Sequence, residues 1–86
     1  MWEIRYTAQA AKDIPKLQST NLAIKAKELA DVIRDNPFQN PPPYEKLQGY
    51  HPARYSRRIN RQHRLVYEVD IELKRIKILR MWTHYE

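Results

Sequence analysis

The second half of the chain contains the kinds of side chain that a metal-free ribonuclease uses. Cleavage of RNA through its ribose 2′-hydroxyl needs a base for the hydroxyl proton, cations around the charged phosphorane, and an acid for the departing 5′-oxygen. A carboxylate, several guanidinium groups and an imidazole can fill these roles without a metal ion. The candidates are Glu45, Arg54, Arg57 or Arg58, His63, Arg64, His84 and Tyr85.

The charge distribution allows a simpler interpretation, a surface that binds a polyanion without cutting it. Residues 1–43 carry six basic and five acidic side chains, whereas residues 44–86 carry ten and five. The excess positive charge therefore lies in the second half, where RNA, DNA or the ribosome would be a natural partner. A basic surface that only keeps the protein in solution is the least specific alternative.

Length and composition limit the classes of protein that fit. With 86 residues the chain has room for one domain, residues 1–86, with a single core. The absence of cysteine excludes disulfides, thiolate zinc sites and cysteine nucleophiles. We expect no metal and no cofactor. The N-terminus lacks a charged segment followed by an apolar run, and no window approaches about 18 consecutive apolar residues, so we expect neither secretion nor membrane insertion. The lack of cysteine fits a reducing cytoplasm, where we place the protein.

The first half predicts one strand and two helices. Apolar and charged residues alternate over residues 2–6, which is typical of a half-buried strand. Thr7 is a candidate N-cap for a helix whose apolar face is formed by Ala10, Ile14 and Leu17. Pro15 lies beyond the first turn of this helix, so we expect a kink or an early end there.

The second helix has a clearer apolar stripe and a clear end. It is predicted to stop at Asn36, because the residue before Pro37 is driven out of the helical region. Residues 36–43 contain four prolines and predict a stiff, extended crossover, which we expect Phe38 to attach to the core. The stripe consists of Leu22, Ala26, Leu29 and Ile33.

The remaining residues predict strands. Along residues 55–59 and 65–69, side chains suited to a core alternate with mainly polar ones. Residues 75–83 are rich in isoleucine, leucine and aromatic side chains. A further short strand is expected around residues 44–47. The predicted fold class is α+β, with the order β-α-α-β-β-β, an antiparallel sheet and both helices on one face. The other face would be free to carry the candidate residues.

Three sequence strings indicate a family. PFQNPPPYEKLQG (residues 37–49), YSRRINRQHRLVYEV (55–69) and KILRMWTHYE (77–86) closely resemble the Txe/YoeB family of bacterial toxins, within the RelE-like superfamily. The resemblance implies a small RelE-like, microbial-ribonuclease-like fold and a type II toxin–antitoxin system whose toxin cuts mRNA at the translating ribosome. One departure is Pro52, in a turn where many relatives carry glycine.

The resemblance also implies partners. These are a cognate antitoxin of the YefM/Phd type with an acidic, disordered C-terminal region, the ribosome and its mRNA. A homodimer and a toxin–antitoxin complex that binds operator DNA are further expectations.

The family assigns catalytic roles to four positions. Glu45 of the PYEKL string matches the general base, and Arg64 of HRLVY matches the arginine that contacts the scissile phosphate. His84 matches the general acid, and Tyr85 the tyrosine that helps to align the RNA. Without the resemblance, Glu45 could equally be a solvated residue paired with Lys46, and His84 part of a frayed chain end.

Four further residues are predicted to bind RNA: Lys46, Arg54, Arg58 and His63. Alternation along a strand sends Arg57 and Arg58 to opposite faces, and Arg57 shares its face with apolar neighbours, so Arg58 is preferred. We expect His63 to cap or orient its turn rather than to take part in catalysis.

Two other functions fit the same fold. A non-catalytic inhibitor of DNA gyrase, resembling the ParE branch, would not need Glu45, Arg64, His84 and Tyr85 together. A plain RNA-binding module would bind RNA with a steep dependence on salt and leave it intact.

Overall fold

The computed structural model describes residues 2–82. The predicted order of elements is confirmed, with the additional short strand where it was expected. The elements are β1 (Glu3–Tyr6), α1 (Ala8–Ser19), α2 (Ala23–Asp35), β2 (Glu45–Leu47), β3 (Ala53–Arg58), β4 (Arg64–Asp70) and β5 (Arg75–Arg80).

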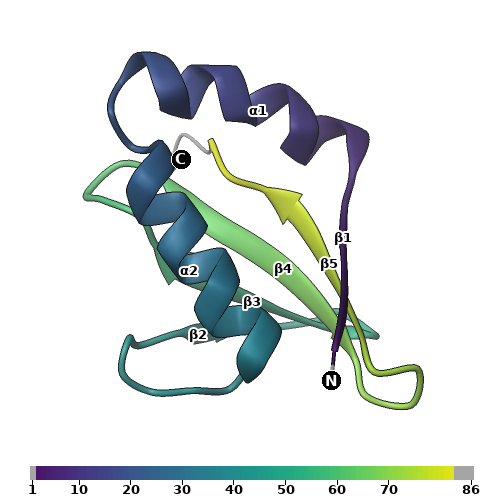
Figure 1. The fold of residues 1–86 in the computed structure, drawn as a ribbon. Helices are drawn as coiled ribbons and strands as arrows, with labels where there is room; N and C mark the ends of the chain where they lie inside the picture. Colours follow the sequence, from purple (N-terminus) through teal and green to yellow (C-terminus); the bar gives the residue numbers. More distant parts are fainter. Residues whose placement is uncertain (1, 83–86) are drawn as a thin grey trace.

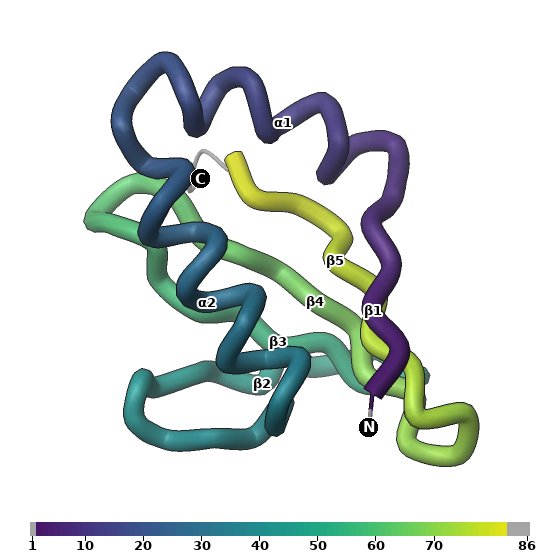
Figure 2. The backbone as a smooth tube through the Cα atoms, in the orientation of Figure 1, coloured from purple at the N-terminus to yellow at the C-terminus, as the bar shows by residue number. Residues whose placement is uncertain are grey.

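The strands form one five-stranded sheet in the order β1-β5-β4-β3-β2. The three pairings among β2, β3, β4 and β5 are antiparallel, as predicted, whereas β1 runs parallel to β5. Figures 1 and 2 show β1 beside β5, with both helices over one face of the sheet. The sheet is therefore mixed, because β1 reaches β5 through the whole intervening chain and no hairpin sets its direction.

Helix α1 begins as predicted but does not end early. The Thr7 hydroxyl accepts a hydrogen bond from the Ala10 N–H at 3.1 Å, as expected of an N-cap. The helix then passes Pro15 and continues to Ser19, so the early end does not occur. Pro15 and Ala11, four residues before it, are both exposed, so water can satisfy the Ala11 carbonyl that proline leaves without a donor.

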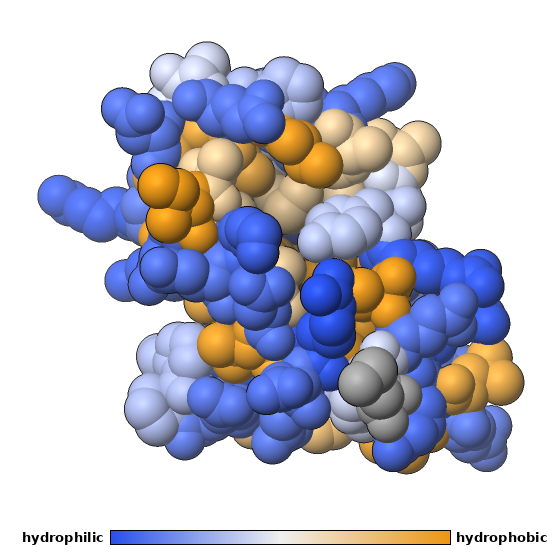
Figure 3. Space-filling model, in the orientation of Figure 1, coloured by the Kyte–Doolittle hydropathy of each residue, from blue (hydrophilic) through white to orange (hydrophobic). Residues whose placement is uncertain are grey.

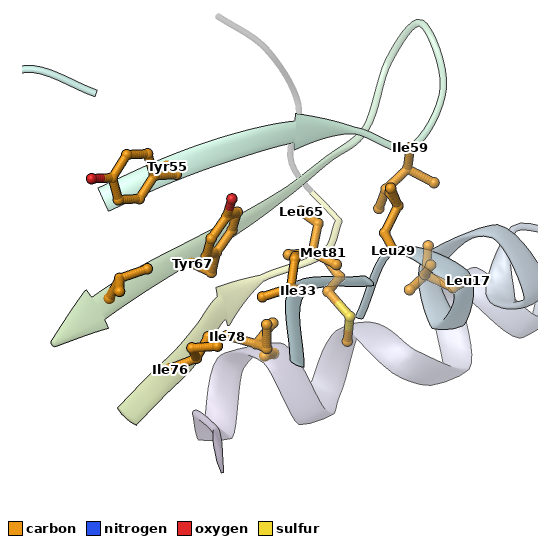
Figure 4. Close-up of a cluster of buried hydrophobic side chains, with 13 residues drawn as sticks. Leu17, Leu29, Ile33, Tyr55, Ile59, Leu65, Tyr67, Ile76, Ile78 and Met81 are labelled. Carbon is orange, nitrogen blue, oxygen red and sulfur yellow. The ribbon is translucent and has the colours of Figure 1, made fainter. Parts of the chain in front are cut away.

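The predicted stripe of α1 is confirmed at Ala10 and Leu17, but its middle position differs. Ile14 is 38% exposed, whereas Asp13 is fully buried. The stripe of α2 is confirmed at Ala26, Leu29 and Ile33. Figure 4 shows apolar side chains of the helices facing those of the sheet, including Leu17, Ile33, Leu65, Tyr67, Ile76 and Ile78. This core fills one face of the sheet and leaves the other open.

The surface on the helix side is mainly hydrophilic, with apolar side chains gathered in a few patches (Figure 3). A hollow of about 250 Å³ lies between the helices, lined mainly by apolar residues of both. No helix among residues 2–82 is long and apolar enough to cross a membrane.

Arg57 fastens the proline-rich crossover to the core. The side chain is fully buried and donates hydrogen bonds to the Tyr67 hydroxyl at 3.1 Å and to the backbone carbonyls of Pro37 and Pro42. Burial raises the pKa of Tyr67, although the hydrogen bond from Arg57 acts against that shift. Phe38 packs on the core as predicted, at 5.4 Å from the Tyr55 ring centroid.

The neighbouring Arg58 is exposed on the opposite face, so the two arginines make a matched pair for stability measurements. We expect Arg57→Ala to lower the free energy of unfolding by about 3 kcal/mol, because it removes the donor to the Pro42 carbonyl and one of the two donors to the Pro37 carbonyl, and because it opens a cavity. Arg58→Ala should change it by less than about 0.5 kcal/mol. Urea unfolding of both variants measures the difference; equal stabilities would contradict this role of Arg57.

Candidate active site

The open face of the sheet carries a cluster of cations at the edge formed by β2, β3 and β4. A hollow of about 310 Å³ lies there. Its lining consists of Pro43, Tyr44, Glu45, Ser56, Arg58 and Arg64. Alternation along β3 puts Ser56 and Arg58 on this face and Arg57 in the core, which confirms the sequence argument about the two arginines.

Strand register explains why these residues meet. Glu45 of β2 lies opposite Ser56 of β3, and Arg58 of β3 lies opposite Arg64 of β4. Like charges directly opposite each other on neighbouring strands destabilise a sheet. The paired arginines therefore cost folding free energy, and a bound anion between them would reverse that cost.

Arg64 is the better fixed of the two arginines. Its Nη1 donates to the Ser56 hydroxyl at 3.2 Å and lies 3.5 Å from a carboxylate oxygen of Glu45. The Arg64 side chain is 19% exposed, whereas that of Glu45 is 63% exposed. A held guanidinium beside an accessible carboxylate suits a phosphate-binding cation next to a general base.

Two of the predicted RNA-binding residues lie away from this hollow. Arg54 is on the same face, but its guanidinium lies over the Tyr50 ring at 4.3 Å and 3.7 Å from a carboxylate oxygen of Glu68. Lys46 lies opposite Tyr55, whose side chain is in the core, so Lys46 is on the other face of β2 from Glu45. The structure does not bring Lys46 together with Arg58 and Arg64.

His63 is buried rather than displayed on the open face. It is 3% exposed, and its ring stacks on Trp82 with 3.8 Å between centroids and 20° between planes. Its backbone N–H donates to the Asn60 side chain at 2.7 Å, and its carbonyl accepts from Ile59 and Asn60. His63 thus orders the β3–β4 turn, in line with the orienting role expected for it, and does not line the hollow.

His84 and Tyr85 lie outside the described residues. The described chain ends at Trp82, whose ring stacks on His63, the residue before Arg64.

Sequence reasoning missed two buried polar residues, Ser56, which supports this site, and Asp13, which lies outside it. Ser56 is 3% exposed and accepts the hydrogen bond from Arg64; its position two residues before Arg58 on an alternating strand is a signal that could have identified it. Asp13 is the second, and its spacing from Ala10 and Leu17 on the α1 stripe was the available signal. Among residues 2–82, no three His, Asp or Glu side chains are grouped so that they could hold a metal ion.

The chain is similar to several solved structures. The YoeB/ParE toxin from Agrobacterium tumefaciens shares 28% identity with a TM-score of 0.82, over 96% of this chain and 99% of that one. The YoeB–YefM complex from Staphylococcus aureus shares 36% identity with a TM-score of 0.77, over 99% of both chains. An archaeal RelE–RelB complex from Pyrococcus horikoshii OT3 shares 25% identity with a TM-score of 0.75, over 94% of this chain and 92% of that one.

These similarities confirm the predicted RelE-like fold. A search of curated protein sequences gave no match. The family described as the YoeB-like toxin of bacterial type II toxin-antitoxin system matches residues 6–85, nearly the whole chain. The protein therefore belongs to the family of YoeB-like toxins of bacterial type II toxin–antitoxin systems.

Proposed function

We propose that the protein is a metal-independent endonuclease that cuts mRNA at the translating ribosome. The observation that carries this proposal is the hollow in which Arg58 and Arg64 oppose each other within reach of Glu45. A binding surface needs the cations only. The accessible carboxylate beside them is explained by proton transfer, since it would otherwise repel a phosphate.

In the proposed reaction Glu45, Arg58 and Arg64 act from the hollow, and His84 and Tyr85 take the roles that the family resemblance assigns to them. Glu45 takes the proton from the ribose 2′-hydroxyl, whose oxygen attacks the adjacent phosphorus. Arg64 and Arg58 stabilise the negative charge of the phosphorane, and Arg64 holds two of its oxygens through its planar fork of donors. His84 gives a proton to the 5′-oxygen as the P–O bond breaks, while Tyr85 aligns the RNA. The products are a 2′,3′-cyclic phosphate, or a 3′-phosphate after hydrolysis, and a 5′-hydroxyl.

The ribosome is part of the proposed substrate, which places the activity in the cytoplasm. Arg58 and Arg64 are few contacts for a free RNA strand, so a second macromolecule that presents the mRNA would supply most of the binding free energy. Arg54 and Lys46 are the groups we assign to contacts with RNA of the ribosome or message.

Toeprinting of an mRNA on programmed ribosomes tests this proposal. The purified protein should produce a new end within the occupied codon, with a 5′-hydroxyl that polynucleotide kinase labels without prior phosphatase treatment. The same mRNA without ribosomes should be cut far more slowly. If the mRNA on the ribosome stayed intact, the protein would be either a plain RNA-binding module or a gyrase inhibitor. A DNA gyrase supercoiling assay would distinguish these two functions.

We further propose that a YefM/Phd-type antitoxin neutralises the protein, as suggested by the YoeB–YefM complex that it resembles. Its acidic segment, disordered alone, would fold over the cations of the open face. A toxin–antitoxin heteromer that binds operator DNA, and a homodimer of the toxin, remain predictions from the same family membership.

The charge of the open face leads to a kinetic prediction for this complex. Association with the product of the adjacent gene should slow at least about tenfold between 50 mM and 500 mM salt, because screening removes long-range attraction. The dissociation rate should change less, since apolar contacts at the centre of the interface determine it. Stopped-flow measurements at both salt concentrations test this; an association rate indifferent to salt would contradict neutralisation through charge.

A further inference from the structure

Asp13 of α1 is a buried carboxylate that the site described so far does not use. It is 0% exposed. Its Oδ2 accepts hydrogen bonds from the backbone N–H groups of Met81 and Trp82, at 2.9 and 3.1 Å. Its Oδ1 accepts from Gln9 Nε2 at 3.2 Å and lies 3.9 Å from Lys16 Nζ. A buried carboxylate destabilises a fold unless hydrogen bonds replace its lost water, so these backbone donors account for an aspartate at this position.

Met81 and Trp82 are held at two further points. The Met81 side chain is 3% exposed and belongs to the core. The Trp82 ring stacks on His63, which directly precedes Arg64 in the chain. Strand β5 ends at Arg80, so the two residues after it are fixed by α1, by the core and by the β3–β4 turn rather than by strand pairing.

We propose that Asp13 is a positioning residue for the reaction, acting through the backbone of residues 81 and 82. This inference rests on the proposed function, in which His84 is the acid. Two residues of chain span at most about 7 Å, so the place and direction in which residue 82 is held limit where the His84 imidazole can act. A displacement of about 1 Å in a reacting group can lower a rate about 100-fold.

Two substitutions separate the hydrogen bonds of Asp13 from its charge. Asp13→Ala removes both acceptors and should lower kcat on programmed ribosomes about 100-fold, with KM for the ribosome changed less than about threefold. Asp13→Asn keeps one oxygen that can accept from both N–H groups, while its amide N–H₂ can face the Gln9 oxygen. The kcat of Asp13→Asn should stay within about fivefold of the wild-type value.

Control variants distinguish positioning from general loss of stability. Lys16→Ala removes only the distant, half-exposed cation and should leave kcat unchanged. Leu29→Ala opens a cavity in the core on α2, and its folded fraction should also keep the wild-type kcat. If Asp13→Asn is as impaired as Asp13→Ala, or if Leu29→Ala loses kcat equally, the proposal is wrong.

A double-mutant cycle tests whether Asp13 acts through His84. In a His84→Ala background, Asp13→Ala should lower the residual rate by less than about threefold, because the group that it positions is already absent. Independent action would instead give the same 100-fold loss in both backgrounds, which would overturn the inference.

A structural measurement tests the anchor without relying on cleavage. The chain has two tryptophans, so Trp2→Phe leaves Trp82 as the only one. In this background, Asp13→Ala should shift the Trp82 emission to longer wavelength and increase its quenching by acrylamide, whereas Asp13→Asn should change neither. Unchanged Trp82 fluorescence in Asp13→Ala would refute the anchor. A wild-type protein that never cuts mRNA would instead refute the proposed function.

Discussion

Glu45→Gln lowers the rate of mRNA cleavage on programmed ribosomes by at least about 100-fold, the usual contribution of a general base. Glutamine has nearly the same shape and keeps an oxygen beside Arg64, but its amide cannot take a proton from the 2′-hydroxyl. The side chain is 63% exposed on an edge strand, so the free energy of unfolding should change by less than about 0.5 kcal/mol. His84→Ala should give a loss of similar size, because it removes the proposed acid.

Glu3→Gln is the matched control for this experiment. Glu3 lies on β1, at the opposite edge of the sheet from β2, and its side chain is 48% exposed. Its carboxylate is also paired with arginines: hydrogen bonds from Arg5 and Arg75 lower the pKa of Glu3. Glu3→Gln should therefore cleave at the wild-type rate. Full toxicity of Glu45→Gln in cells without antitoxin, or an equal loss in Glu3→Gln, would contradict the assignment of Glu45 as base.

The sequence was sufficient to predict features that depend on local periodicity. The alternation along residues 55–59 and 65–69 identified which side chains enter the core, because a strand buried on one face must repeat every two residues. It also separated Arg57 from Arg58. The proline before the crossover fixed the end of α2, since the restriction on Asn36 is a property of neighbouring atoms.

Features that depend on distant parts of the chain were not predictable in this way. The direction of β1 against β5 and the stacking of His63 on Trp82 arise from contacts between segments far apart in sequence. On α1 the prediction placed Ile14 in the core instead of Asp13, because an aspartate, satisfied by amides of residues 81 and 82, occupies a position that periodicity reserves for apolar side chains.

Strand β2 shows a third limit of prediction from the sequence. With only three residues it has too few positions to show which of its faces is apolar, so the sequence could not decide which of Glu45 and Lys46 faces the site. The register of β2 against β3 decides which residue faces the site, and this register brings only Glu45 into the hollow. The catalytic roles of Glu45 and Arg64 thus came from the family resemblance, and the strand register explains why the two residues meet.

Arg64→Lys is expected to keep the positive charge and still lower the rate of the cleavage step about 100-fold. A guanidinium presents two parallel donors to two phosphate oxygens, whereas an ammonium is a point charge on a flexible stem. In this structure Ser56 and Glu45 hold the Arg64 fork in one orientation, at 3.2 and 3.5 Å, and the lysine cannot satisfy both while contacting a phosphate. The loss should therefore fall on the chemical step rather than on binding.

Single-turnover cleavage with saturating toxin on programmed ribosomes separates the two effects. Arg75→Lys is the control, because Arg75 lies on the same face at the far side of the sheet and pairs with Glu3 at 3.1 Å. It should cleave at the wild-type rate. If Arg64→Lys bound ribosomes less tightly but cut at the wild-type rate once bound, Arg64 would be a general RNA contact. The stabilisation of the phosphorane would then have to come from Arg58, the arginine directly opposite on β3.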